Sequence, residues 1–352
     1  MSAEGVRVAT LIASVAPIDA DAAAAARARH ERLAKPPGSL GKLEAVGATL
    51  AGIARSCPPP VPDPAWLVIC AADHGVVASG VSRWPQAVTA AMVGTFLAGR
   101  AAASALAASV GASVVVLDVG VATRHAPHPM LIDANVRAGT ADFSVEPAMT
   151  RDQAVRAILA GVRVAEDLAL RGAGLVALGD MGIGNTTAAA CLIATFTGRE
   201  AAEVTGRGAG ADDLELARKT EVVERALDLH HPEPTDPLGA LYRVGGLELA
   251  ALVGVILATA SAGRPVLLDG VNTNAAALVA QAFCPAVTGY LIAGHRSTEP
   301  GATHALAHLG LDPLLDLDMR LGEGSGALLA IPIVRAAAKA LADMATIDEV
   351  AG

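Results

Sequence analysis

Short, almost entirely apolar runs alternate along this chain with long segments rich in alanine and leucine, and this alternation restricts the folds open to it. Strands that are apolar on both faces are typical of a parallel sheet covered on each side by helices. The pattern therefore predicts an α/β fold with a doubly wound, mainly parallel sheet. The strands are expected at residues 65–73, 112–120, 173–180, 264–270, 289–295 and 313–319.

The segments between these runs have helical spacing, and helices are expected at 86–110, 150–171, 185–197, 212–229, 246–262, 272–283 and 300–309. The chain ends differ from this pattern. Two helices are predicted before the proline-rich "CPPPVPDP", and a last helix has no strand after it. We therefore expect a small helical domain from residues 1–58 and 325–352, beside a large α/β domain of residues 59–324.

Composition excludes several classes of function. The net charge is -9 and aromatic residues make up only 2%, so a nucleic-acid partner is not expected. A small anion would have to be bound by local means, such as a helix N-terminus or one well-placed base. The four cysteines have no CxxC spacing and are typical of buried thiols in a reducing compartment.

Membrane and export signals are weak. The apolar run at residues 249–263 ends at Arg264 and is too short to span a bilayer. "VATLIASVAPIDA" near the start resembles a signal core, but only Arg7 precedes it, and Asp19 and Asp21 follow closely. We expect a cytoplasmic protein without a membrane partner.

Polar residues and glycines follow most of the predicted strands. Ligands of a doubly wound sheet bind beyond the carboxyl ends of its strands, so these residues mark a candidate site. They are residues 73–75, 118–120, 179–182, 269–270, 295–297 and 320–324.

"LGDMGIGNTTAAACL" at 178–192 has the order expected of a phosphate cradle: a strand, a glycine-rich loop and a helix start. The same pattern fits a tight turn with a helix cap, and "LLDGVNTNAAALV" at 267–279 repeats it. Its spacing matches neither GxGxxG nor GxxxxGK[ST], so no standard nucleotide fingerprint is present.

Lys219 is one of only four lysines, and it follows a second glycine-rich turn, "TGRGAGADD" at 205–213. A compact charge beside bare backbone amides suits a phosphate, although an exposed helix lysine would look the same. His74 and His295, with Asp73, Asp118 and Asp269, could in principle hold a metal ion. None has dedicated ligand spacing, so no metal is expected.

Glu323 stands between two glycines in "MRLGEGSGA", directly before an apolar run. It could complement the dipole of the last helix at its N-terminus. It could instead be a general base, because flanking glycines let a flat ligand approach and the apolar run would raise the pKa of the carboxyl group. The residues alone leave both interpretations open.

Several blocks together resemble the nicotinate-nucleotide–dimethylbenzimidazole phosphoribosyltransferases of cobalamin biosynthesis. They include "KPPGSLGKLE" (35–44), "CAADHGVVASGVSRWPQAVT" (70–89), "LGDMGIGNTT" (178–187) and "MRLGEGSGA" (319–327), in family order over nearly the whole chain. The resemblance implies a Rossmann-like large domain, a helical domain from both chain ends, and a homodimer with sites near its interface. It implies no cofactor.

The resemblance also implies a reaction. The family moves the 5-phosphoribosyl group from nicotinate mononucleotide to 5,6-dimethylbenzimidazole, releasing nicotinate and inverting the anomeric carbon to give α-ribazole 5′-phosphate. Glu323 is then the base that takes the azole proton, and the phosphate lies against Gly182, Gly208 and Lys219. Asp180 falls where other members carry a glutamate, so this chain has a shorter carboxylate side chain at that position.

The azole-binding segment, by the same resemblance, is "SRWPQAVTAAMV" at 82–93. Trp84 and Met92 take the places of smaller or more polar residues, which is expected to alter the accepted benzimidazole or purine. Gln86 and Leu321 are also expected to contact substrate. Two alternatives remain: a nucleotide-binding α/β oxidoreductase, weakened by the missing GxGxxG, and a metal-dependent phosphohydrolase built on the strand-end acids and histidines.

Overall fold

A six-stranded parallel sheet organises the chain in a computed structural model that describes residues 3–351. The strand order is β3-β2-β1-β4-β5-β6, and Val68 of β1 lies opposite Val115 of β2 and Leu178 of β4. This order is that of a doubly wound, Rossmann-like sheet, so the predicted fold class is confirmed. The strands are β1 (Ala65–Ala72), β2 (Ser113–Gly120), β3 (Leu131–Asp133), β4 (Leu175–Met181), β5 (Val266–Leu268) and β6 (Leu291–Ala293).

Fifteen α-helices lie in the described residues, with two short 3₁₀ helices at Gly75–Ser79 and Pro285–Tyr290. The α-helices are α1 (Ala3–Ser14), α2 (Ala20–Arg32), α3 (Lys42–Ala54), α4 (Ala87–Leu97), α5 (Ala102–Val110), α6 (Arg151–Leu170), α7 (Asn185–Thr197), α8 (Ala201–Val204), α9 (Asp213–His230), α10 (Pro237–Val244), α11 (Leu247–Ser261), α12 (Val271–Phe283), α13 (Pro300–Leu309), α14 (Ser325–Asp343) and α15 (Ile347–Ala351).

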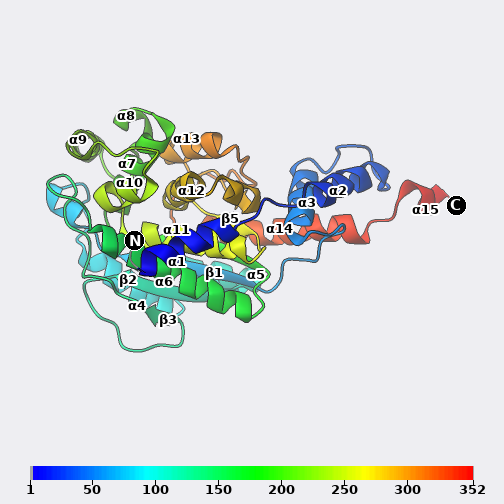
Figure 1. Cartoon of the computed structure of the whole chain (residues 1–352), viewed down its shortest axis with the longest axis horizontal. Coiled ribbons are helices and arrows are strands. Elements are labelled where there is room, and N and C mark those ends of the chain that lie inside the picture. The colour runs from blue at the N-terminus through cyan, green and yellow to red at the C-terminus, as the bar shows by residue number, and fades with distance from the viewer. Residues whose placement is uncertain (1–2, 352) are drawn as a thin grey trace.

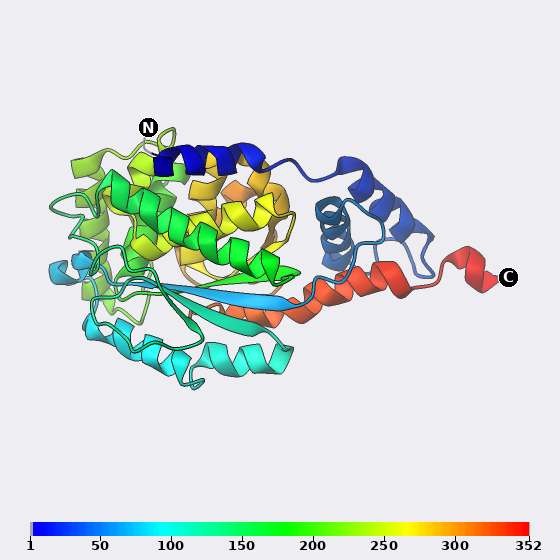
Figure 2. The same ribbon diagram turned by 60° about the horizontal axis from the view of Figure 1, so that its bottom comes forward.

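Helices cover both faces of the sheet (Figure 2). Alternate residues of β1 enter two different cores: Val68 and Cys70 belong to the core that includes α6 and α11, whereas Leu67 and Ile69 belong to the core that includes α5 and α14. All four side chains are fully buried. A strand buried on both sides has no polar face, which explains why these runs are almost uninterrupted in the sequence.

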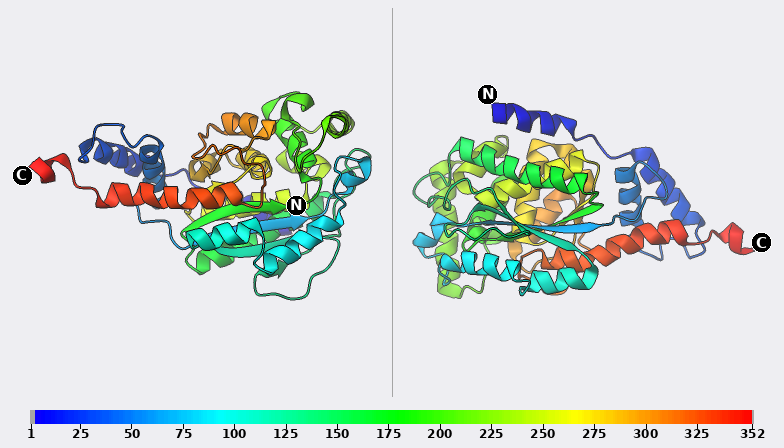
Figure 3. Two further views of the ribbon diagram at one scale, coloured as in Figure 1. Left: turned by 180° about the vertical axis from the view of Figure 1, so that it is seen from behind. Right: turned by 90° about the horizontal axis from the view of Figure 1, so that it is seen from below.

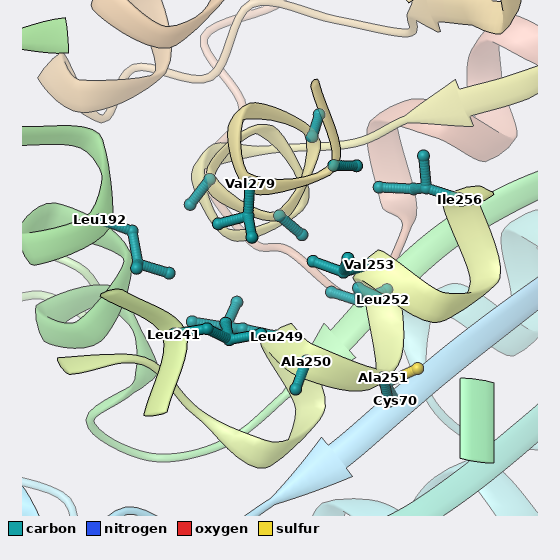
Figure 4. Packing of buried hydrophobic residues seen from close by; sticks show 14 of the residues in the cluster. Cys70, Leu192, Leu241, Leu249, Ala250, Ala251, Leu252, Val253, Ile256 and Val279 are labelled. Carbon is teal, nitrogen blue, oxygen red and sulfur yellow. The ribbon is translucent and has the colours of Figure 1, made fainter. Parts of the chain in front are cut away.

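Helices α6 and α11 approach each other closely because each carries a glycine at the contact. A Cβ at Gly161 would lie 1.9 Å from the carbonyl oxygen of Ala251, and a Cβ at Gly254 would lie 1.9 Å from that of Ile158. Figure 4 shows Leu252 and Val253 of α11 directed toward the helix α12 that carries Val279. Helix α11 is therefore fixed between the sheet and the outer helices.

The chain ends meet in a helical unit that projects from the sheet (Figures 1 and 3). Helix α14 begins against β4 and β5 and continues outward to pack on α3 and α2. Helix α1, however, packs on α6 and α11, with Arg7 bound to Glu166 at 2.7 Å. Residues 3–14 thus lie on the large domain, and the predicted boundary at 58 is wrong for them. The apolar side of α1, which includes Val8, is buried there.

Two further predictions about elements need correction, and several elements were missed. Residues 86–110 form two helices, α4 and α5, because Gly99 between them adopts a left-handed conformation (φ +68°). Residues 313–319 are not a strand: only Leu315 pairs, by an isolated bridge to His295, and Asp318 has φ +55°. The edge strand β3 was not predicted, nor were α1, α8, α10 and α15.

Two helical stretches, Ala87–Val110 and Ser325–Asp343, are long and apolar enough to cross a membrane by length and composition alone. The first is the α4–α5 pair, which is interrupted at residues 98–101. This is weak evidence, because a helix in a protein core passes the same test. Both stretches contribute buried residues to the core on one sheet face.

Candidate active site

Two adjoining cavities lie at the carboxyl edge of the sheet, where the sequence predicts a site. The Glu323 cavity, of about 200 Å³, is lined by Glu323, Asp180, Met92, Leu321 and neighbouring residues. The Lys219 cavity, of about 60 Å³, is lined by Lys219 and Trp84 among others. The two cavities share the residues Gly182, Ile183, Asn185, Thr186, Gly208 and Ala209. The structure therefore brings all the predicted site residues except Gln86 to one region.

Glu323 occupies an unusual backbone turn. Gly322, Glu323 and Gly324 have φ values of +82°, +62° and +84°, so three successive residues are left-handed. For a glutamate this conformation costs roughly 1–2 kcal/mol, whereas glycine adopts it freely. Strained residues of this kind concentrate at functional sites. The two glycines that flank Glu323 in the sequence motif thus allow the left-handed turn that carries it.

The turn packs directly on β4. A Cβ at Gly179 would lie 2.7 Å from the carbonyl oxygen of Glu323, and a Cβ at Gly324 would lie 2.3 Å from Leu67 Cδ1. No side chain other than hydrogen fits at either position. The backbone of Glu323 is therefore held against the sheet, and its carboxylate starts from a fixed point.

Asp269, at the end of β5, anchors the same turn. Its buried carboxylate accepts hydrogen bonds from the amides of Gly324 (3.0 Å), Gly326 (2.7 Å) and Ala327 (3.1 Å). His295 Nε2 lies 3.4 Å from Asp269 Oδ1. The sequence marks Asp269 as a strand-end residue of the candidate site and a possible metal ligand, with no link to Glu323. Its actual contacts, which join residues 55–58 positions apart, leave no local signal in the sequence.

Burial raises the pKa of Glu323, and the negative charge of Asp269 adds to the rise, while the amide of Ala103 partly opposes it. Glu323 is only 7% exposed, and its Oε2 atom has no hydrogen-bond partner. It does not cap α14, since Asp269 takes the first amides of that helix. The helix-dipole interpretation for α14 is therefore unsupported, and a desolvated carboxylate with one oxygen free of hydrogen bonds suits a general base.

Asp180 lies on the wall of the same cavity. Its Oδ2 atom accepts hydrogen bonds from Asn185 Nδ2 (2.9 Å) and Asn272 Nδ2 (2.6 Å). Burial, reinforced by the charge of Asp269, raises the pKa of Asp180 to about 7, although the two amides oppose this. Asn272 was not predicted as a site residue. It sits in the "DGVNTN" turn, whose likeness to the first glycine-rich loop was the available signal.

Lys219 is buried rather than an exposed helix lysine. Its Nζ donates to Thr186 Oγ1 at 2.7 Å and to the Gly206 carbonyl at 2.8 Å. Burial lowers the pKa of Lys219 to about 8, and the nearby Glu299 carboxylate opposes the decrease. The Gly208 amide donates to Glu299 Oε1 at 2.8 Å. Gly208 lines both cavities, but its backbone N–H already donates to Glu299 and so does not point freely at a phosphate.

Trp84 and Met92 do not form one wall. Trp84 is 47% exposed, lines the Lys219 cavity, and donates from Nε1 to the carbonyl of Ala209 at 3.3 Å. Met92 lines the Glu323 cavity. Gln86 lines neither and has its amide next to Gly139. The expectation of a shared azole wall is thus corrected for Trp84, because the 82–86 segment turns toward the glycine-rich loop at 205–211.

His74, Asp73 and Asp118 have contacts outside the two cavities. His74 Nε2 lies 2.8 Å from Glu248 Oε1, and both side chains are fully buried. Asp73 accepts a hydrogen bond from the Ala122 amide, and Asp118 from the amides that follow it. Within residues 3–351 no three or more His, Cys, Asp or Glu side chains are grouped as they would be to hold a metal ion.

A phosphoribosyltransferase family model, DBI_PRT, matches residues 15–351 of this chain. The chain belongs to this family. Two curated phosphoribosyltransferases named for nicotinate nucleotide and dimethylbenzimidazole are similar over 96% of both chains: one from Salinispora tropica (53% identical) and one from Roseiflexus sp. (52%). The crystal structure of CobT from Thermus thermophilus is 47% identical and superposes with a TM-score of 0.91, covering 94% of this chain and 98% of its own.

Membership of the family makes this chain a phosphoribosyltransferase and confirms the family resemblance found in the sequence. The structural match covers the same sheet and flanking helices, so fold and sequence agree on one assignment. Neither the oxidoreductase nor the phosphohydrolase alternative gains support from these relatives.

Proposed function

We propose that this phosphoribosyltransferase transfers the 5-phosphoribosyl group from nicotinate mononucleotide to 5,6-dimethylbenzimidazole or a related azole, for cobalamin biosynthesis. The products are α-ribazole 5′-phosphate and nicotinate. One observation carries the proposal: Glu323, a buried carboxylate with one oxygen free of hydrogen bonds, lines a cavity that shares a wall with a second cavity containing the buried Lys219. We assign the carboxylate to the azole end of the product and the cation to its phosphate end.

The chemistry at Glu323 follows from its surroundings. An azole nitrogen attacks C1′ from the face opposite nicotinate, and the new C–N bond forms as the old one breaks. The electron pair of the old bond returns to the nicotinate nitrogen, so the leaving pyridinium needs no proton. The attacking azole becomes more acidic and gives its remaining N–H proton to Glu323. A carboxylate with little solvation is a stronger acceptor than one in water.

We assign the phosphate of the substrate to the Lys219 cavity. The N-terminus of α7 opens into it, Lys219 is buried in its wall, and Arg83 and Arg207 line it. Amide groups at a helix start and an embedded cation are the usual means of holding a phosphate. The ribose would then pass Asn185 and Thr186, which belong to both cavities, and present C1′ inside the Glu323 cavity.

We also propose that the enzyme is a cytoplasmic homodimer with its sites near the interface. Trp84, Leu317 and Leu321 are 47%, 54% and 55% exposed, and Trp84 and Leu321 belong to cavity walls. Large apolar side chains left uncovered in this way favour a protein contact. Sedimentation of the full chain would show a single dimer; a monomer at all concentrations would contradict this point.

The test incubates the full chain with nicotinate mononucleotide and 5,6-dimethylbenzimidazole in the presence of EDTA. Chromatography and mass analysis then look for the α-ribosyl azole phosphate and an equal amount of nicotinate. Formation of both supports the proposal. Absence of product together with absence of nucleotide binding by calorimetry would overturn it, whereas binding without product, repeated with purine and other benzimidazole acceptors, would redirect it to a different base.

A further inference from the structure

The Glu323 cavity has an uneven distribution of charge. Three carboxylate side chains line it: Asp180, Glu299 and Glu323. Arg320 is the one basic residue among the described residues that line this cavity. An anionic group entering the cavity therefore meets carboxyl groups on several sides and a positive charge on one.

Arg320 is held at this place without being neutralised. Its Nη1 atom donates a 3.0 Å hydrogen bond to the carbonyl oxygen of Gly208, so the side chain reaches from the Glu323 turn to the glycine-rich loop. No carboxylate of residues 3–351 forms an ion pair with it within 4.0 Å. The two arginines of the neighbouring Lys219 cavity differ, because Arg83 pairs with Glu215 and Arg207 with Asp213.

We propose that Arg320 determines the specificity for the leaving group by pairing with the carboxylate of nicotinate. This inference rests on the proposed function and adds to it the choice of donor. Nicotinate and nicotinamide mononucleotides differ only in that the first carries a carboxylate where the second carries an uncharged amide. A guanidinium is suited to this choice, since it forms two parallel hydrogen bonds with a carboxylate.

The surrounding acids make the pairing necessary. Those carboxyl groups that are ionised favour the positively charged pyridinium ring, but they repel the negative charge of the substituent on it. Arg320 offsets this repulsion at one side of the cavity only, and so also fixes the orientation of the ring. With the ring oriented, the opposite face of C1′ remains open to the azole.

The test compares the wild-type enzyme with Arg320→Gln and Arg320→Lys, using nicotinate mononucleotide and nicotinamide mononucleotide as donors and 5,6-dimethylbenzimidazole as acceptor. Arg296→Gln is the matched control, because Arg296 lies on a neighbouring loop, pairs with Asp316 at 3.3 Å and lines neither cavity. The measured quantity is kcat/KM for each donor and their ratio. The ratio of the inhibition constants of nicotinate and nicotinamide measures the preference for the carboxylate over the amide independently of turnover.

We expect Arg320→Gln to lower kcat/KM for nicotinate mononucleotide roughly tenfold or more, and to change it much less for the amide. Arg320→Lys should retain part of the selectivity, and Arg296→Gln all of it. An unchanged ratio in Arg320→Gln, or an equal loss for both donors, would overturn the inference while leaving the proposed function intact. If the wild type binds neither donor and turns over neither one with benzimidazole or purine acceptors, the proposed function fails and this inference fails with it.

Discussion

Replacing Glu323 by glutamine should change activity and stability in opposite directions. The side chain is 7% exposed, its Oε2 has no partner, and burial raises the pKa of its carboxyl group. A folded-state pKa above the unfolded value means that the native state binds the proton more tightly. Stability contributed by this group therefore falls as pH rises through the folded pKa, and at pH 8 an ionised Glu323 is a cost to the fold.

Glutamine removes that cost at nearly constant volume. Each pKa unit of the shift corresponds to about 1.4 kcal/mol, so Glu323→Gln should unfold at higher denaturant concentration than the wild type at pH 8. The gain should disappear at pH 4, where the wild-type carboxyl group is protonated as well. Turnover should fall ~10²–10⁴-fold with nucleotide binding retained, because proton acceptance is lost and the cavity shape is not.

Paired urea titrations at pH 4 and pH 8, with steady-state rates on the same preparations, make the comparison. Glu166→Gln is the control, since that glutamate is bound to Arg7 of α1 and lines neither cavity. Unchanged turnover in Glu323→Gln would refute the general-base assignment. Lower stability at pH 8 would refute the argument that its charge is unpaired and desolvated.

Three other changes give separate checks. Lys219→Met should raise KM for nicotinate mononucleotide more than it lowers kcat, and wild-type kcat/KM should decline above about pH 8, where Lys219 loses its proton; a flat alkaline profile would contradict this. Gly254→Ala should destabilise by about 3 kcal/mol or more in thermal unfolding, because its Cβ would meet a carbonyl oxygen at 1.9 Å, whereas Gly94→Ala, which meets nothing within 4 Å, should not. Asp269→Asn should slow turnover at least tenfold and move the acidic limb of the rate profile to lower pH; an unmoved limb would show that its charge does not act on Glu323.

The elements with a strong local pattern could be read from the sequence. Helix α7 was predicted at its observed residues, and five of the six predicted strands are present. Strands β1, β2 and β4 could be recognised because they are apolar on both faces. Helix α1 was missed because its sequence resembles a short export signal core. Strand β3 has only three residues and gains its pairing from Val116 to Asp118, a partner that no local pattern reveals.

The candidate site likewise has a part that the sequence reveals and a part that only the fold reveals. Glu323 and Lys219 stand out in the sequence, one by its glycines and the other by its rarity. The contacts that give them their properties join distant segments: Glu299 binds the Gly208 amide from 91 residues away. Such pairings depend on which strand lies beside which. They follow from the fold and could not be derived from motif spacing.

The arrangement of Asp269 and Glu323 answers a physical difficulty at the start of α14. A helix N-terminus stabilises a negative charge, so a glutamate placed there would ordinarily become more acidic and a poorer base. Here Asp269 takes the free amides of Gly324, Gly326 and Ala327, which leaves Glu323 without those donors. The same Asp269 charge then raises the pKa of Glu323 further. Removing the charge in Asp269→Asn reverses both effects, and for that reason the acidic limb must move to lower pH while the turn loosens and the rate falls.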